Sequence, residues 1–261
     1  MSATELLEPD PGALLIVGGA EDKAGHCAIL CELVRLGGGP SARIAVLTVA
    51  SQFPREVGAS YVRTLTRLGA AHVEPVDVRE RAQADDPAVL RAIEDASAVY
   101  FSGGIQVRIA RLIGGTELHA VLRRRWEAGL VVGGTSAGAA AMSATMILGS
   151  PGPPNVPTAE VMLGTGLGFV PEVIVDQHFS ERRRLGRLLT AVGRHPDLLG
   201  VGIDEDTAIL LRGSRADVLG RGAATLVDAR GTAGSDGPVQ LQRVPAGHGF
   251  TVRQTAPVTP A

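Results

Sequence analysis

The sequence is poor in cysteine, in net charge and in long apolar runs, and each shortage excludes a class of protein. Its 261 residues include only Cys27 and Cys31, too few for a disulfide framework, which favours a reducing compartment. The formal net charge of −2 at pH 7 gives no reason to expect a nucleic-acid partner or an anionic membrane surface. No apolar segment is long enough to span a bilayer, and residues 1–12 lack the basic and apolar regions of a secretion signal. We therefore expect a cytoplasmic protein without a membrane partner.

What the sequence does contain is an alternation of short apolar segments and longer amphipathic ones. The apolar segments that we interpret as buried strands are Ala13–Val17, Arg43–Val49, Val73–Val76, Ala98–Phe101 and Leu130–Val132. The helices predicted between them are Lys23–Leu36, Arg55–Leu68 and Pro87–Asp95, with further helical segments through Ala128. This alternation is typical of a three-layer α/β fold, in which helices cover both faces of a mostly parallel sheet. Active sites in such sheets lie beyond the C-terminal ends of the strands.

After Val201 the pattern changes to short strands with tight connections. They are predicted at Ala208–Leu211, Val218–Leu219, Ala224–Val227 and Val239–Val244. We interpret them as a small antiparallel extension packed at one edge of the same domain. The resulting organisation is an N-terminal arm at 1–12, one α/β domain at 13–253 and a disordered tail at 254–261, with a proline- and glycine-rich loop at Gly149–Thr158.

An apolar run that ends in G-x-S-x-G is the most informative motif. Leu130–Val132 leads into the letters G-T-S-A-G and then into small helix-forming residues. This order places Ser136 on a sharp strand-to-helix turn that exposes its hydroxyl at the end of the sheet. Backbone amides of Ala137, and of the Gly103-Gly104 turn after a neighbouring strand, are then expected to stabilise negative charge beside that hydroxyl. Ser136 is a candidate nucleophile, and the alternative is a serine that only caps the helix.

A nucleophilic serine needs a base, and His178 has the best context among the six histidines. Glu172–Asp176 is predicted to be a strand, so Gln177 and His178 lie at its end, on the same edge of the sheet as Ser136. Surface or capping roles are preferred for the other five, which are His26, His72, His119, His195 and His248. No metal site is expected, because His26 and Cys27 are adjacent rather than at ligand spacing.

A run of arginines follows His178. Arg184 and Arg187 are three residues apart and share one face of a predicted helix, while Leu185 and Leu188 pack inward. Such a cluster near the base is able to hold a substrate carboxylate through forked hydrogen bonds. A solvated basic helix face is the alternative, and the spacing alone favours that alternative.

Five segments in this order resemble a known family. They are V-G-G-A-E-D-K ending at Lys23, F-S-G-G-I-Q ending at Gln106, G-T-S-A-G-A-A-A-M ending at Met142, V-D-Q-H-F-S-E-R-R-R-L-G-R-L ending at Leu188, and G-I-D-E-D-T-A ending at Ala208. The chain is similar in these segments to the cyanophycinase group of serine peptidases in peptidase family S51. The resemblance extends from about Leu14 to about Phe250, and the D-Q-H-F segment with its spaced arginines is the most discriminating part.

The resemblance implies a fold, an activity and an assembly. The fold is an α/β sandwich similar to class I glutamine amidotransferases, and the assembly is a homodimer. The implied substrate is cyanophycin, a polymer with an aspartate backbone whose β-carboxyls carry arginine, and the products are β-aspartyl-arginine dipeptides. No metal or cofactor is implied.

The resemblance also assigns roles to residues. Ser136 is implied as the nucleophile and His178 as the base. The implied substrate-binding set is Gln106, Asp176, Gln177, Arg182, Arg184 and Arg187. These types suit the polymer, because arginines bind carboxylates and an acidic group such as Asp176 is able to receive the guanidinium of the substrate.

Two departures from the family pattern bear on activity. We expect the relay glutamate of the family in the loop after the nucleophile helix, but Gly149–Asn155 contains no carboxylate, and Glu160 is the nearest acid downstream. The expected result is a rate lower by a few orders of magnitude. Ile105 is apolar where the family has a polar residue beside the oxyanion turn, which predicts an altered substrate choice.

Other interpretations stay open at this stage. A related serine peptidase acting on aspartyl dipeptides keeps the fold and changes the substrate, and a non-catalytic relative keeps only the arginine-lined cleft. Nucleotide binding at Gly18-Gly19 is weakly supported, because the G-x-G-x-x-G spacing is absent and Glu21 and Asp22 repel phosphate. For Glu205 and Asp206 the sequence leaves two roles, support of the site or the structure of a turn.

Overall fold

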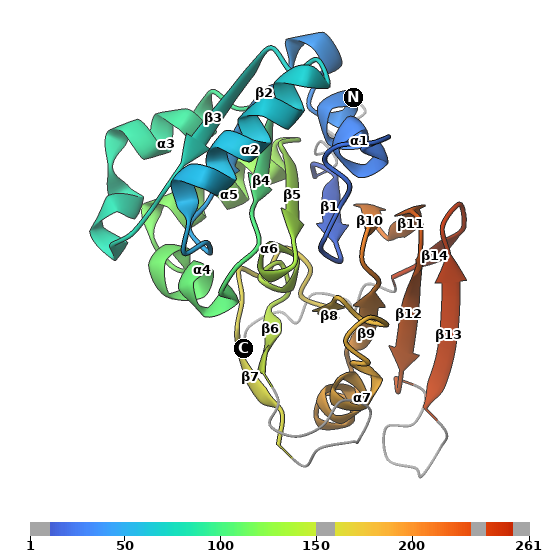
Figure 1. Cartoon of the computed structure of the whole chain (residues 1–261). Coiled ribbons are helices and arrows are strands. Elements are labelled where there is room, and N and C mark those ends of the chain that lie inside the picture. Colours follow the sequence, from blue (N-terminus) through green and yellow to red (C-terminus); the bar gives the residue numbers. More distant parts are fainter. Residues whose placement is uncertain (1–10, 150–159, 231–238, 253–261) are drawn as a thin grey trace, which may run out of the picture.

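An eight-stranded sheet forms the centre of the computed structural model, which describes residues 11–149, 160–230 and 239–252 (Figure 1). Its strands run in the order β14-β11-β10-β1-β5-β4-β2-β3. The five from β1 to β3 are mutually parallel and comprise β1 (Leu14–Val17), β5 (Val131–Thr135), β4 (Ala98–Phe101), β2 (Arg43–Leu47) and β3 (His72–Val76). The antiparallel edge comprises β10 (Thr207–Arg212), β11 (Arg215–Gly220) and β14 (Gly249–Thr251).

Helices cover both faces of the parallel strands, because these strands are apolar on both sides. In β1, Leu15 and Val17 pack against α1 (Ala28–Leu36) and α2 (Pro54–Arg67), whereas Leu14 and Ile16 face the opposite core. The helices of that second core are α3 (Pro87–Glu94), α4 (Gln106–Ile113), α5 (Glu117–Glu127) and α6 (Ala137–Ala140). The predicted three-layer α/β fold with a mostly parallel sheet is confirmed.

A second sheet lies next to the central one, toward the C-terminal ends of β1 and β5 (Figure 1). Its strands run in the order β13 (Gln240–Pro245), β12 (Ala223–Asp228), β9 (Leu199–Ile203) and β8 (Val173–Gln177). Because α7 (Leu185–Arg194) connects β8 to β9, these two strands are parallel and end at the same edge. The short pair β6 (Thr145–Gly149) and β7 (Met162–Thr165) completes the strands among the described residues.

Two sequence-based expectations about the elements are corrected. The antiparallel extension is divided, because β10 and β11 continue the central sheet whereas β12 and β13 pair with β9 in the second sheet. The first helix begins at Ala28 instead of Lys23, because the Asp22 carboxylate accepts the amides of Ala24, Gly25 and Cys27 and holds a turn there.

Parts of the predicted organisation lie outside the described residues. These are residues 1–10 of the arm, the tail at 254–261 and most of the loop after Gly149. At the end of the arm, Gly12 donates to the Trp126 carbonyl at 2.7 Å, and the Trp126 indole donates back to the Gly12 carbonyl at 2.6 Å. None of the described helices is long and apolar enough to cross a membrane.

Candidate active site

Ser136 occupies a strained turn between β5 and α6. Its backbone has φ 52° and ψ −108°, a conformation that non-glycine residues rarely adopt. Its amide donates to the Val17 carbonyl on β1 at 3.0 Å. A Cβ on Gly138 would lie 2.6 Å from the Cβ of Phe101, so this turn needs small residues. The Ser136 side chain makes no capping hydrogen bond to α6, which argues against the helix-cap alternative.

The hydroxyl of Ser136 is hydrogen-bonded to the predicted base. Ser136 Oγ lies 2.9 Å from Nε2 of His178, which follows β8. His178 has φ 48°, and its amide donates to the Gly18 carbonyl at 2.7 Å. A Cβ on Gly19 would lie 2.3 Å from Cε1 of His178, so only a glycine lets the backbone lie against the ring. The end of β1 therefore holds the imidazole against the serine.

Glu205 supplies the acid that the sequence analysis placed elsewhere. Its Oε1 lies 2.6 Å from Nδ1 of His178. The sequence left two roles open for Glu205, and this contact favours support of the site over the structure of a turn alone. The loop in which the relay glutamate of the family is expected lies largely outside the described residues. The Glu205 amide donates to the exposed Glu181 at 3.1 Å, and the Asp206 amide donates to the Gly19 carbonyl at 2.9 Å. These bonds fix the turn that carries the acid.

A signal for Glu205 is present in the sequence. Leu199–Ile203 is a second apolar run of five residues, and it follows the helix that begins after His178. A strand, a helix and a strand in this order form a parallel pair, in which Gln177 is opposite Ile203. The residues just after each strand are therefore neighbours, which places Glu205 beside His178.

The surroundings of His178 keep its imidazole neutral. Burial lowers the pKa of His178 below its ordinary value of 6.5, and the charges of Arg182 and Arg184 lower it further. The hydrogen bond and the charge of Glu205 oppose this shift without reversing it. A neutral imidazole with Glu205 on Nδ1 has Nε2 free to accept the Ser136 proton, as a general base requires.

Two of the residues predicted to stabilise an oxyanion, Ala137 and Gly103, lie next to Ser136. Ala137 is the first residue of α6, where backbone amides point out of the helix. A Cβ on Gly103 would lie 3.4 Å from the Cβ of Ser136, so the turn after β4 contacts the serine directly. Gly104 has φ 144°, and its backbone packs against the Ala50 carbonyl.

A cavity of about 370 Å³ opens in front of the serine and the histidine. Sequence reasoning missed the polar residues that line its far side, although Glu21 and Lys23 belong to the V-G-G-A-E-D-K segment. Glu21 is buried and accepts hydrogen bonds from Tyr61 at 2.5 Å and Thr135 at 2.6 Å, with Lys23 Nζ at 2.9 Å. Burial raises the pKa of Glu21, but Lys23 and the two hydroxyls outweigh that effect and hold it below its ordinary value.

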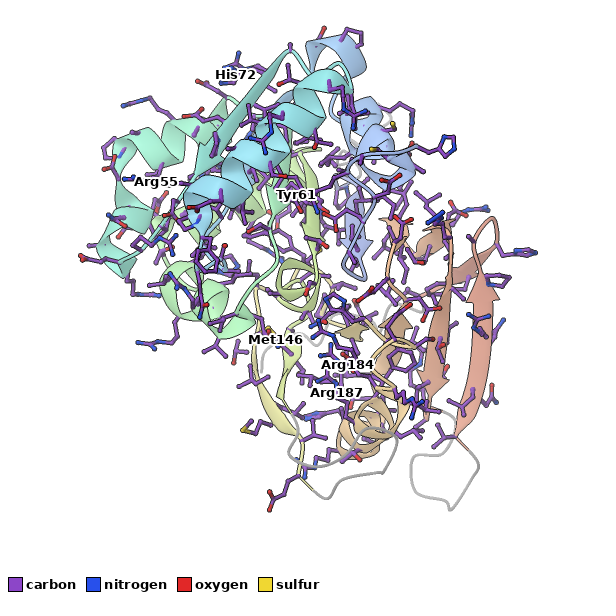
Figure 2. The ribbon with its side chains drawn as sticks, viewed as in Figure 1. Arg55, Tyr61, His72, Met146, Arg184 and Arg187 are labelled. Atoms are coloured by element: carbon purple, nitrogen blue, oxygen red, sulfur yellow. The ribbon has the colours of Figure 1, made fainter. Side chains whose placement is uncertain are left out.

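The predicted arginines pair with residues of the protein. Arg187 makes a two-pronged contact with Asp176, in which Nε donates to Oδ2 at 2.7 Å and a terminal nitrogen donates to Oδ1. Arg184 donates to the backbone and side-chain oxygens of Gln177 at 2.6 and 2.5 Å. Figure 2 shows both arginines on the side of α7 toward the central sheet. Burial, with Arg187 and Arg182 nearby, lowers the pKa of Arg184 to about 10.

This pairing changes the role expected for Asp176. Its side chain is 1% exposed, and both carboxylate oxygens are occupied by arginines. Geometry therefore favours a carboxylate that orients Arg184 and Arg187 over one that receives a substrate guanidinium. Arg182 is exposed one turn after His178, and Gln106 begins α4, where its amide nitrogen donates to the Ile147 carbonyl on β6 at 3.0 Å.

Comparison with known proteins assigns the chain to a family. The sequence profile of peptidase family S51 matches residues 14–219. The chain belongs to peptidase family S51. It is 43% identical over 218 residues to a protein named cyanophycinase from Trichormus variabilis, which covers 83% of this chain and 73% of the relative. A cyanophycinase from Geminocystis herdmanii is 41% identical over 220 residues, which covers 84% of this chain and 81% of the relative.

A solved structure supports the fold independently. The crystal structure of a peptidase from an acI-B1 Actinobacterium superposes with a TM-score of 0.70 at 23% identity, covering 93% of this chain and 98% of that one. The family profile and the two relatives confirm the resemblance to the S51 family stated from five segments. Within residues 11–149, 160–230 and 239–252, no group of three histidine, cysteine or acidic side chains is arranged to hold a metal ion.

Proposed function

We propose that this S51 peptidase hydrolyses cyanophycin from a chain end and releases β-aspartyl-arginine dipeptides. The observation that carries the proposal is the continuous hydrogen-bonded chain from Ser136 through His178 to Glu205 at the edge of a cavity. The relatives named cyanophycinase, at 41–43% identity over most of the chain, support the substrate.

In the proposed reaction, His178 Nε2 removes the proton from Ser136 Oγ as this oxygen attacks the carbonyl of the scissile bond. Glu205 holds the imidazole in the required tautomer and stabilises the imidazolium that forms. Backbone amides of Ala137 and of the Gly103-Gly104 turn donate to the developing oxyanion. The imidazolium then protonates the leaving amine, the C–N bond breaks, and water hydrolyses the acyl-enzyme by the same proton transfers in reverse.

Substrate binding in this proposal uses the basic groups beside the catalytic pair. Arg182 is exposed, whereas Arg184 is held in place by Gln177 and close to Asp176. Fixed guanidinium groups bind carboxylates with little loss of side-chain entropy. Each substrate unit carries a carboxylate on its arginine, which suits these side chains. Gln106, Gln177 and Arg187 complete the proposed set, and Asp176 acts by orienting the two arginines.

The test is digestion of purified cyanophycin with products identified by mass spectrometry. The wild type is expected to release β-aspartyl-arginine, and Ser136→Ala to release none. Ser60→Ala is the matched control, because Ser60 lines the same cavity without contacting His178 in the described structure. Dipeptide release by Ser136→Ala at the wild-type rate would reject the nucleophile assignment. Release from aspartyl dipeptides alone would move the substrate assignment to the related peptidase.

We extend the proposal to assembly, location and domain structure. A homodimer follows from the S51 resemblance, and light scattering of the purified protein tests it. A cytoplasmic location is supported by the buried Cys27 and the exposed Cys31, which are both free thiols. Residues 13–253 are proposed to unfold as one domain, which calorimetry tests through the agreement of calorimetric and van't Hoff enthalpies.

A further inference from the structure

A second cavity, of about 430 Å³, lies on the other side of the turn that contacts Ser136. Three arginines line it, Arg79, Arg108 and Arg111, together with the apolar Ile105, Val107 and Leu112. Four of these six residues lie on α4. We call this feature the arginine cavity. The proposed catalytic steps use none of its three arginines.

The arginine cavity carries uncompensated positive charge. Arg79 Nε donates to Asp77 at 2.5 Å, and Arg79 Nη1 donates to the Ser51 carbonyl at 2.9 Å, so its guanidinium is fixed. Its Nη2 is buried and has no hydrogen-bond partner among the described residues. Arg108 and Arg111 make no ion pair within the part of the chain that the structure describes. Three guanidinium groups therefore face one carboxylate, which favours an anionic ligand.

Neighbouring elements do not neutralise this charge. The 3₁₀ helix Arg81–Asp85 packs against α4, and its Arg81 donates to the Arg111 carbonyl at 2.8 Å, which adds a further positive group. Asp85 of the same helix accepts the Glu117 amide at 3.0 Å, so its carboxylate is engaged at the start of α5.

The arginine cavity adjoins the catalytic cavity through one short turn. Gly103 lines the cavity in front of Ser136, and Ile105, two residues later, lines the arginine cavity. Two residues span at most about 7 Å. The Ile105 amide donates to the Ala50 carbonyl at 2.9 Å, next to the Ser51 carbonyl that holds Arg79. The turn and Arg79 are thus anchored to the same loop after β2.

We propose that the arginine cavity binds carboxylates of the cyanophycin units beyond the one that reacts at Ser136. This inference rests on the proposed function. Arginine attached to each β-carboxyl through its amino group keeps its own carboxylate and its guanidinium, so each unit presents one group of each charge. The proposal places the carboxylate against the arginines of the cavity and the substrate guanidinium in solvent. An extended backbone advances about 3.3–3.6 Å per residue, so the turn from Gly103 to Ile105 places the third unit, two beyond the one that reacts, at the arginine cavity. Ile105, Val107 and Leu112 provide apolar surface for the methylene groups of the substrate.

The test compares long and short substrates. Arg108→Ala combined with Arg111→Ala is expected to raise KM for cyanophycin about tenfold or more, because two charge-assisted contacts are lost. For a two-unit substrate, which is too short to reach the cavity, we expect a change of less than about twofold. The matched control is Arg63→Ala combined with Arg91→Ala, which removes the same charge from exposed positions on α2 and α3. That control is expected to change neither value.

Two outcomes overturn the inference. KM for cyanophycin that is unchanged in the Arg108→Ala, Arg111→Ala variant shows that the cavity binds no polymer. Equal changes for the long and the short substrate show that the variant perturbs the catalytic site itself.

Failure of the proposed function is a separate result. If the wild type cleaves neither substrate, retention on immobilised cyanophycin is compared for Ser136→Ala with and without the two arginine substitutions. Equal retention then rejects the arginine cavity as a polymer site, whereas weaker retention of the arginine variant supports polymer binding by a non-hydrolytic protein.

Discussion

The two halves of the candidate site are built on different principles. The half that carries Ser136 has no charged side chain from Val131 to Met142, and its glycines and alanines fit around the turn with little space to spare. The half that carries His178 contains an aspartate, a glutamate and four arginines between Asp176 and Arg187, with Glu205 beside them. Close packing of small residues positions the side chain of the first half, whereas ion pairs and charged hydrogen bonds position the side chains of the second.

This difference predicts which substitutions each half tolerates. A change of charge at constant size is expected to be harmful in the histidine half. An added methyl group at constant charge is expected to be harmful in the serine half. Single substitutions in each half separate sensitivity to charge from sensitivity to added volume. A variant that departs from its expected result shows that the halves are more alike than their composition indicates.

The largest effect is expected from Glu205→Gln. The amide keeps the size of the side chain but removes the charge that holds the histidine tautomer, and we expect kcat to fall by about 10²–10⁴-fold. Because Glu205 raises the pKa of His178, its loss lowers that pKa further. The acid limb of the kcat/KM profile is therefore expected to move to lower pH, which a pH series of initial rates measures.

A purely structural role for Glu205 makes a different prediction. It would reduce the melting temperature and leave the acid limb where it is. Glu205→Asp is the rescue variant, because it restores the charge at a longer distance, and its kcat is expected to lie between those of the wild type and Glu205→Gln. Equal kcat for all three proteins contradicts the assignment.

Asp176→Asn tests how much a buried charge that does not contact Ser136 or His178 contributes to the stability of the histidine half. Its carboxylate is 1% exposed and pairs with Arg187, which is 13% exposed. Removing one partner of a buried ion pair costs about 3–5 kcal/mol of stability. Urea unfolding measures this loss. The matched control is Glu94→Gln, which breaks ion pairs to the exposed Arg124 and the half-buried Arg125 and is expected to cost about 1 kcal/mol. Equal losses for the two variants contradict the prediction.

Gly138→Ala tests the half that depends on space. The added Cβ would lie 2.6 Å from both the Cβ and the carbonyl oxygen of Phe101, so α6 has to move. We expect a loss of about 1–3 kcal/mol in urea unfolding, together with lower kcat because Ser136 moves with the helix. Gly193→Ala is the control. Gly193 lies on α7, and a Cβ added there would have no neighbouring atom within 4 Å. It is expected to be neutral or to stabilise by about 0.5–1 kcal/mol.

The difference between the serine half and the histidine half also explains which parts of the site the sequence could predict. Local patterns suffice for the serine half, because the apolar run, the two glycines and the helix are contiguous in the chain. The other parallel strands follow from short local segments in which apolar residues predominate, and Ala98–Phe101 matches its strand to the residue. The exception is β3, which contains His72 and Glu74 and is mostly exposed.

The histidine half depends on pairings between distant segments. Glu205 reaches His178 only because β8 and β9 are parallel, and the apolar run Leu199–Ile203 was not interpreted as a strand. Similarly, the shared helical face of Arg184 and Arg187 was visible in the spacing, but their pairing with Asp176 and Gln177 depends on how α7 packs beside β8. Periodicity gives the face of a helix and leaves its partner undetermined.

Arg182→Gln is expected to move the acid limb of the kcat/KM profile by a small amount. Loss of the proposed substrate contact lowers kcat/KM at every pH and leaves the position of the limb to report the charge. Arg182 is exposed, and its positive charge lowers the pKa of His178. Removing this charge raises that pKa, so a larger fraction of the histidine is protonated at a given acid pH and the acid limb of kcat/KM moves to higher pH. This direction is opposite to that expected for Glu205→Gln. Arg183→Gln removes the same charge from the next residue, which is not among the main causes of the His178 pKa shift, so its acid limb is expected to move less than that of Arg182→Gln. Identical profiles for the two variants would mean that net charge, rather than the position of Arg182, sets the titration of the base.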